Sequence, residues 1–270
     1  MRPFREMSAA LCGRVRGVFF DIDDTITTEG RLEASAYQAV ERLQQAGLLT
    51  IPITGRPAGW CDMIARFWPV DAVVGENGAF SFAYDRQQSR MIRSYAIPEE
   101  TRLQDQQKLS ALQEQILREV PGCAVSADQP YREADLAIDF CEDVPALPFS
   151  QVERIRDLFV EAGAEAKISS IHVNGWFGSY DKLTACQKLM TEQFGVSLEE
   201  ARDEFLFVGD SPNDEPMFRF FPNACGVANV LQFAETLQHP PTWITEQKSG
   251  HGFVELVEHV LARRPALEEG

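Results

Sequence analysis

Three aspartates within four positions follow a short apolar stretch near the start of the chain. Residues 17–20 read GVFF, and Asp21, Asp23 and Asp24 come directly after them. Carboxylates that lie this close together repel one another, so the cluster is costly unless a cation or a proton lies between them. The residue types at this point of the chain are therefore suited to binding a cation.

Two later segments have the same form. Residues 48–54 are largely apolar and lead into the sequence TGR, and residues 204–209 are largely apolar and lead into the sequence DSPND. Together with residues 17–21, these segments are typical of buried strands. Ligands of open parallel sheets bind outside the carboxyl ends of the strands. If the three strands are neighbours, their polar tips converge on one crevice.

Four aspartates would then lie in this crevice, namely Asp21, Asp23, Asp210 and Asp214. Carboxylate oxygens favour Mg²⁺, which usually keeps some of its waters and also contacts a substrate phosphate. A divalent cation would offset the repulsion between the carboxylates. One acidic cluster alone is often only a turn or a helix cap, but a second cluster at another strand end favours a metal site.

Apolar strands alternate with helical patterns on both sides of a central region. Residues 33–46 and 57–68 fit helices between the first strands, and residues 181–194 and 252–262 fit helices in the last third of the chain. Apolar strands without alternation, separated by helices, indicate a parallel sheet covered on both faces. The predicted fold class is therefore α/β, with a doubly wound, Rossmann-like parallel sheet as its core.

The central region has a different pattern. Antiparallel strands come first, then a long polar helix, then short strands and a second helix. This pattern predicts an α+β cap domain inserted over residues 85–179, and it assigns residues 13–84 and 180–270 to the catalytic core. We expect the cap to move about hinges near residues 83–86 and 178–181.

The composition limits the classes of partner. Lys and Arg number 25 while Asp and Glu number 41, which gives a net charge of −16 and argues against nucleic acid. No apolar run approaches the roughly 18 residues of a membrane helix, and the N-terminus lacks the apolar region of a secretory signal. The cysteines are scattered without a CxxC pair, which predicts reduced thiols in a cytoplasmic protein. The sequence carries no indication of oligomeric state.

The ordered motifs resemble those of a known family. DIDDT, TGR, the lysine of DK and GDSPND resemble the four motifs of the haloacid dehalogenase (HAD) superfamily of phosphohydrolases. The insertion between the second and third motifs is similar to the type IIB cap of Cof-like sugar phosphatases, sucrose-phosphate phosphatase and mannosylphosphoglycerate phosphatase. GENGA, at residues 75–79, resembles the NGA element that precedes that cap.

The resemblance implies a catalytic role for each matching residue. Asp21 would be the nucleophile that forms an aspartyl-phosphate, and Asp23 would protonate the leaving alcohol and then activate water. Thr54 and the Gly55 N–H would hold a phosphoryl oxygen. Lys182 would neutralise charge on the phosphoryl group. A lysine at a helix start is disfavoured by the helix dipole, which also supports a functional role.

The resemblance also implies the metal ligands. Asp21, the backbone carbonyl of Asp23, and Asp210 would bind Mg²⁺. Asp214 and Asn213 would bind the ion or orient its waters. Mg²⁺ is therefore the expected cofactor.

Gly55, Arg56 and Asn77 are the candidate substrate-binding residues of the core. Arg56 has two interpretations, because it could contact phosphate or pair with an acidic neighbour. Asn77 could contact substrate or simply form the turn into the cap. The residues alone do not separate these alternatives.

The cap is expected to select the substrate. If residues 169–180 contain a strand, His172, Asn174 and Trp176 share one face, which suits the hydroxyls and the apolar surface of a sugar. The alternative is an ordinary strand face with a packed Trp176. Arg132 is the candidate cation for a second phosphate or a carboxylate of the substrate.

The favoured function is a Mg²⁺-dependent phosphomonoester hydrolase that acts through an aspartyl-phosphate on a small phosphorylated metabolite, such as a sugar phosphate or derivative. A phosphomutase uses the same nucleophile and remains an alternative. A non-enzymatic phospho-aspartate regulatory module is disfavoured, because receivers of that kind are about half as long and lack a large cap.

Overall fold

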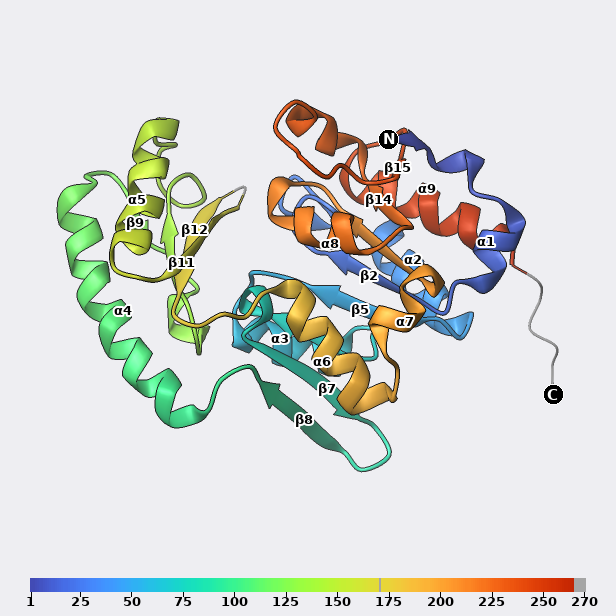
Figure 1. Ribbon diagram of the computed structural model, residues 1–270, viewed down its shortest axis with the longest axis horizontal. Coiled ribbons are helices and arrows are strands. Elements are labelled where there is room, and N and C mark those ends of the chain that lie inside the picture. Colours follow the sequence, from blue (N-terminus) through green and yellow to red (C-terminus); the bar gives the residue numbers. More distant parts are fainter. Residues whose placement is uncertain (170, 265–270) are drawn as a thin grey trace.

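The chain folds into a large α/β core with a smaller cap on one side, as the computed structural model in Figure 1 shows. The structure describes residues 1–169 and 171–264. The cap, which comprises the elements from α4 to β12, has its own four-stranded sheet. In the described part of the chain, no helix combines the length and the apolar character needed to cross a bilayer.

The core is built on a nine-stranded sheet with the order β1-β15-β14-β13-β2-β5-β6-β7-β8. Neighbouring strands are parallel from β1 to β6, and only the pairs β6–β7 and β7–β8 are antiparallel. The predicted doubly wound α/β fold is confirmed. The strands are β1 (Arg2–Pro3), β2 (Gly17–Asp21), β5 (Leu49–Ile53), β6 (Val73–Gly75), β7 (Phe80–Asp85), β8 (Arg90–Tyr95), β13 (Phe205–Gly209), β14 (Ala224–Gly226) and β15 (Trp243–Ile244).

Helices cover both faces of this sheet (Figure 1). Val18 and Phe20 of β2 belong to an apolar cluster with α1, α2, α3 and α9, whereas Phe19 belongs to a second cluster with α6, α7 and α8. Every residue of β2 is buried, because its side chains alternate between two covered faces. The helices are α1 (Ala9–Arg14), α2 (Ala34–Gln45), α3 (Ala58–Phe67), α6 (Lys182–Phe194), α7 (Leu198–Ala201), α8 (Glu215–Phe220) and α9 (Ser249–Ala262); a small hairpin is formed by β3 (Thr27–Thr28) and β4 (Arg31–Leu32).

The cap consists of an antiparallel sheet, in the order β11-β12-β10-β9, with two helices on the face away from the core (Figure 1). The helices bury Leu112, Ile116, Ile155 and Phe159 against this sheet. The other face of β12 is left to meet the core. The elements are α4 (Glu99–Glu119), β9 (Ala124–Val125), β10 (Leu136–Asp139), α5 (Phe149–Glu161), β11 (Glu165–Ile168) and β12 (His172–Trp176).

The predicted insertion, residues 85–179, differs from the structure at its first boundary. β7 and β8 form a hairpin that extends the core sheet, so the chain leaves the core only after Tyr95. The physical reason is that Phe80 and Phe82 stack with their ring centroids 4.4 Å apart inside the core cluster. The first expected hinge, at residues 83–86, therefore lies at the end of a core strand and its turn, not in a linker.

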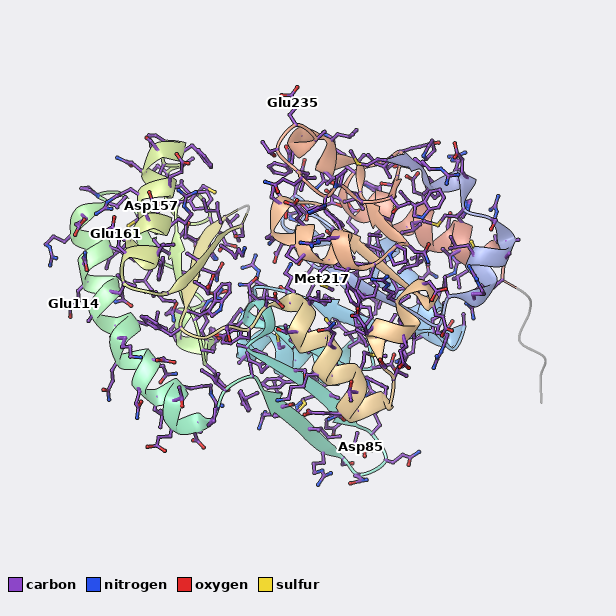
Figure 2. All side chains as sticks on the ribbon, in the orientation of Figure 1. Asp85, Glu114, Asp157, Glu161, Met217 and Glu235 are labelled. Carbon is purple, nitrogen blue, oxygen red and sulfur yellow. The ribbon has the colours of Figure 1, made fainter. Side chains whose placement is uncertain are left out.

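Part of the negative charge lies on the outer surface. Figure 2 shows Glu114 and Glu161 on the cap helices and Glu235 on the core, all on exposed positions, whereas Met217 lies within the core. Acidic groups at exposed positions are well solvated and need no partner. The aspartates of the strand tips have a different environment.

Removing a buried side chain of the cap should destabilise the protein. Ile155 is fully buried between α5 and the cap sheet. We expect Ile155→Ala to lower the free energy of unfolding by about 2 to 5 kcal/mol, because it leaves a cavity. Val160 lies on the same helix and is 57% exposed, so Val160→Ala should change the free energy of unfolding by less than about 0.5 kcal/mol. Urea denaturation measures both, and equal losses in the two variants would contradict the described packing.

Candidate active site

Three strand tips meet at one edge of the core sheet. β2 lies between β5 and β13 in the sheet, and all three run in the same direction. Asp21 ends β2, Thr54 follows β5 and Asp210 follows β13. The sheet order also reverses here, because the chain moves from β2 to β5 on one side and later returns to β13 on the other. This switch point is where open α/β sheets bind ligands.

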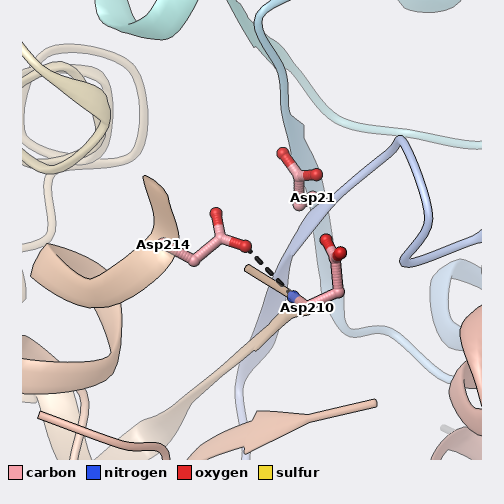
Figure 3. A group of neighbouring side chains, drawn as sticks. All are labelled: Asp21, Asp210 and Asp214. Atoms are coloured by element: carbon pink, nitrogen blue, oxygen red, sulfur yellow. Dashed lines mark hydrogen bonds between the residues drawn. The ribbon is translucent and has the colours of Figure 1, made fainter. Parts of the chain in front are cut away.

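An acidic triad lies at this point (Figure 3). Asp21, Asp210 and Asp214 each place a carboxylate oxygen within 4.8 Å of the others, and all three are buried. Lys182 lies between two of them, with its Nζ 2.7 Å from Asp21 Oδ1 and 2.7 Å from Asp214 Oδ1. One ammonium therefore neutralises part of the charge of three carboxylates.

The position of Lys182 is set by the start of α6. The Asp181 side chain accepts a hydrogen bond from the Thr184 N–H, and the Thr184 hydroxyl accepts one from the Asp181 N–H. This capping box makes Lys182 the first residue of the helix. The Lys182 side chain extends from the N-terminus of α6, where the helix dipole disfavours a cation. The carboxylates of Asp21 and Asp214 therefore hold the ammonium in this place.

Burial determines the protonation of the triad. It raises the pKa of Asp21 to about 8 although Lys182 opposes the shift, and it raises the pKa of Asp210 well above its usual range, with Asp214 adding to the effect. Burial alone would lower the pKa of Lys182, but the two carboxylates outweigh it and raise that pKa. The site therefore retains an excess of carboxyl groups that a divalent cation would satisfy.

The donor set fits a hard cation such as Mg²⁺. Asp210 accepts hydrogen bonds from Thr25 Oγ1 at 3.1 Å and from Asn229 Nδ2 at 3.2 Å, which hold its carboxylate in place. Asp214 Oδ2 accepts the Asp210 N–H at 3.1 Å (Figure 3). The other oxygen of Asp214 accepts a hydrogen bond from Lys182. Asp21 and Asp210 are thus oriented as oxygen ligands, and Asp214 orients both the lysine and the strand tip.

The predicted phosphate-binding segment is held in a tight turn. Thr54 Oγ1 accepts the Arg56 N–H at 3.0 Å, and the Thr54 carbonyl accepts the Asn77 N–H at 3.1 Å. A Cβ on Gly55 would lie 3.2 Å from Asn77 Nδ2, so Asn77 packs directly over the glycine. Gly55 and Asn77 both line the pocket beside Asp21.

Arg56 pairs with the second aspartate of the motif. Its Nη2 donates to Asp23 Oδ1 at 2.9 Å and to Glu142 Oε1 at 3.3 Å, and its guanidinium lies over the Trp60 ring at 4.6 Å. His172 Nε2 lies 2.9 Å from the other oxygen of Glu142. Of the two interpretations of Arg56, the structure supports the one in which it pairs with an acidic neighbour. The contacts from Arg56 to Glu142 and from Glu142 to His172 link the core to the cap.

Two cap residues differ from their predicted surroundings. Trp176 is buried and stacks on Tyr180 with ring centroids 5.7 Å apart, so it offers no apolar platform to a sugar, and the packed alternative holds. Arg132 donates to the carboxylates of Asp128 and Asp135 and, at 2.9 Å, to the Gly55 carbonyl. The arginine therefore cross-links the cap to the phosphate-binding turn.

The pocket between the core and the cap is small. Asp21, Asp23 and Asp210 line it from the core, and His172 and Asn174 line it from the cap, where Asn174 also donates to a cap aspartate. Its cavity volume is about 30 Å³, which suffices for roughly two water molecules. A cavity of this size is too small for a phosphate ester.

One protein family matches this chain. The family model described as haloacid dehalogenase-like hydrolase matches residues 18–132. A phosphoglycolate phosphatase from Methanospirillum hungatei is 26% identical over 260 residues, covering 92% of this chain and 100% of that protein. The chain is similar to the haloacid dehalogenase-like hydrolases. The predicted resemblance to the HAD superfamily is confirmed.

Solved structures share the fold of this HAD-like hydrolase. A Thermoplasma acidophilum protein gives a TM-score of 0.71 at 18% identity and covers 92% of this chain and 98% of its own. A HAD subclass IIB sugar phosphatase gives a TM-score of 0.61 at 16% identity, over 91% of this chain and 98% of its own. At these identities the likeness establishes the architecture alone.

Glu76 anchors the cap of this hydrolase to its core. The fully buried carboxylate accepts hydrogen bonds from the N–H groups of Glu133, Ala134 and Asp135 in the cap, at 2.9, 2.6 and 3.1 Å, and from the Ala58 N–H in the core at 3.0 Å. Burial raises the pKa of Glu76 to about 8. These four contacts, the Glu76 anchor, hold the cap loop against the start of α3.

Three residues that the sequence analysis did not single out take part in the site. Asn229 bridges the Asp24 carbonyl and the Asp210 carboxylate, Glu142 joins Arg56 to the cap, and Glu76 forms the anchor. None of them lies in one of the four motifs that the sequence analysis used. The one sequence signal that included Glu76 is the segment GENGA, through its resemblance to the NGA element that precedes the cap.

Three buried carboxyls predict how stability depends on pH. The folded pKa values of Asp21, Asp210 and Glu76 are raised above those of an unfolded chain, because burial disfavours the charged form. From about pH 4 to about pH 8 the folded protein binds protons that the unfolded chain has released, so stability decreases as the pH rises. In EDTA, the midpoint of thermal unfolding should fall between about pH 5.5 and pH 8. Added Mg²⁺ should raise the midpoint of thermal unfolding more at pH 8 than at about pH 5.5, because fewer protons compete with the ion for the carboxylates. A midpoint that rises with pH in EDTA would contradict this assignment.

Weakening the Glu76 anchor should release the cap loop. Glu76→Gln turns an amide NH₂ toward backbone N–H donors, so at least one of them loses its partner. Hydrogen exchange at residues 133–135 should become at least about tenfold faster, while exchange in β13 stays unchanged. Glu114→Gln, on the exposed face of α4, is the matched control. Unchanged exchange at residues 133–135 would show that the anchor does not hold the loop.

Proposed function

We propose that this HAD-type phosphatase is a Mg²⁺-dependent phosphomonoester hydrolase that works through a phosphorylated Asp21. The observation that carries the proposal is Lys182, whose ammonium lies 2.7 Å from both Asp21 and Asp214 at the switch point of the sheet, where all three side chains are buried. A buried lysine against a carboxylate nucleophile suits a reaction in which negative charge accumulates on a phosphoryl group.

The proposed reaction has two steps. Asp21 attacks phosphorus and the bond from phosphorus to the alcohol oxygen breaks, while Asp23 donates a proton to that oxygen. Asp23 then takes a proton from water, which attacks the aspartyl-phosphate and releases phosphate. Thr54 and the Gly55 N–H hold a phosphoryl oxygen, and Lys182 opposes the rise in the pKa of Asp21 that burial causes.

Mg²⁺ is the proposed cofactor, and its chemistry is to neutralise the phosphoryl oxygens and the triad. Asp21, Asp210 and the Asp23 carbonyl would hold it. Asp214 and Asn213 would fix its surroundings, since Asp214 orients the strand tip and Asn213 lines the pocket with its Oδ1 accepting a hydrogen bond from Ser211. In this proposal, side chains of the protein carry out all the proton transfers.

The proposed substrate is a small phosphorylated metabolite. The relative from Methanospirillum hungatei is named a phosphoglycolate phosphatase, which supports a small phosphate ester as the substrate. A sugar phosphate is the second candidate, because the polar side chains of His172 and Asn174 line the pocket, although Trp176 is withdrawn from it. The cytoplasm is the proposed location, since all six cysteines are free and suit a reducing compartment.

Replacing the nucleophile should abolish turnover. Asp21→Asn removes the attacking charge, so phosphate release with Mg²⁺ should fall at least about 1,000-fold across a panel of small phosphate esters and sugar phosphates. Circular dichroism should show an unchanged fold. Asp203→Asn, at an exposed position, is the control and should retain activity.

Each result of this panel has a defined meaning. Retained activity of Asp21→Asn in a clean preparation would overturn the nucleophile assignment. An isomerised sugar phosphate in place of free phosphate would indicate a phosphomutase instead of a hydrolase.

A further inference from the structure

The pocket has two ends of different chemistry. The core end carries the acidic triad and the phosphate-binding turn. The cap end is formed by Lys167 of β11, by Ser169 directly after that strand, and by His172 and Asn174 of β12, all of which line the same cavity. A substrate whose phosphoryl group lies at Asp21 therefore presents its other end to this cap surface.

Strand register places three cap side chains toward the cavity. Lys167 of β11 pairs directly with Asn174 of β12, so their side chains share a face, and His172 shares it two residues away. The intervening residues Ile168 and Val173 point the other way and pack with the cap helices. Lys167 thus belongs to the pocket face by the pairing of the strands, and its exposed ammonium remains accessible to solvent.

The cations around the pocket differ in how they are engaged. Arg56 is paired with Asp23 and Glu142, and Arg132 with Asp128 and Asp135. Lys182 is held between the carboxylates of the triad.

Lys167 is engaged by none of these groups. Within residues 1–169 and 171–264, no carboxylate pairs with Lys167 and no hydrogen bond from its ammonium is present. In a chain with a net charge of −16, an unpaired ammonium on a pocket wall is available to a negatively charged ligand.

We infer that Lys167 is a specificity-determining residue that binds a carboxylate at the end of the substrate opposite the phosphoryl group. The inference rests on the proposed function and names its substrate class, which is a small phosphorylated carboxylic acid. Lys167 takes the place that the sequence analysis gave to Arg132, because Arg132 is used to hold the cap loop.

The surroundings of Lys167 also suit the capture of an anion. The lysine lies at the junction between the pocket and a wider groove of about 550 Å³, which Arg202 and Arg219 line from the core. Neither arginine has a carboxylate partner among the residues that the structure describes. Lys167, Arg202 and Arg219 therefore line the two adjoining cavities without a carboxylate partner among the described residues, although Glu215 also lines the wider groove.

The test compares two esters that differ in one group. 2-Phosphoglycolate ends in a carboxylate, and 2-hydroxyethyl phosphate ends in a hydroxyl of similar size. The ratio of kcat/KM for the first ester over the second is measured with Mg²⁺. Lys167→Met should lower this ratio about tenfold, mainly through KM, because it removes one charge-assisted contact. Lys167→Arg should restore most of it. Arg118→Met, which removes an exposed cap cation on α4, should leave the ratio unchanged.

The outcomes separate this inference from the proposed function. If the wild-type protein hydrolyses these esters and Lys167→Met leaves the ratio unchanged, or if the wild type does not prefer the carboxylate, Lys167 does not select the substrate. If the wild-type protein releases phosphate from neither ester nor from any ester of the panel, the proposed function fails, and this inference fails with it.

Discussion

The contact between Lys182 and the two aspartates Asp21 and Asp214 is the interaction on which the rest of the site depends. It joins β2, the start of α6 and the loop after β13, which lie far apart in the sequence. Without the ammonium, the strand tips would bring uncompensated carboxylates together in a buried place. With it, Asp214 is free to hold the Asp210 N–H, and the tip of β13 keeps its position beside β2.

The cap is tied to this centre by two different kinds of contact. Glu76 accepts hydrogen bonds from the backbone of the cap loop. This contact therefore depends on the path of the backbone more than on the side chains of the loop. Arg56, in contrast, reaches Glu142 through side chains and at the same time holds Asp23, the proposed acid and base. The first contact positions the cap, while the second makes the surroundings of Asp23 depend on whether the cap is closed.

Much of the core could be predicted because its signals are local. Asp21 and Asp210 follow apolar runs without alternation, which mark strands buried on both faces, and the helix predicted over residues 181–194 lies at Lys182–Phe194. The pairing between segments that lie far apart in the sequence was harder to predict. An alternating pattern does not specify which sheet a hairpin joins, so β8, which lies within residues 85–179, was assigned to the insertion. Likewise, the sequence does not indicate that Arg132 is already satisfied by Asp128 and Asp135, because those contacts exist only after the loop has folded.

The Glu76 anchor has a consequence for recombining domains within this fold. The anchor takes its acceptor from the core and its donors from the backbone of residues 133–135, so neither part is complete without the other. A cap transplanted from a relative would retain this attachment only if its loop presented three N–H groups to a glutamate at position 76. Exchanging the cap sequence while replacing that glutamate would leave either an unpaired buried carboxylate or unpaired amides. Residue 76 and the cap loop therefore have to be exchanged together, although they lie in different parts of the chain.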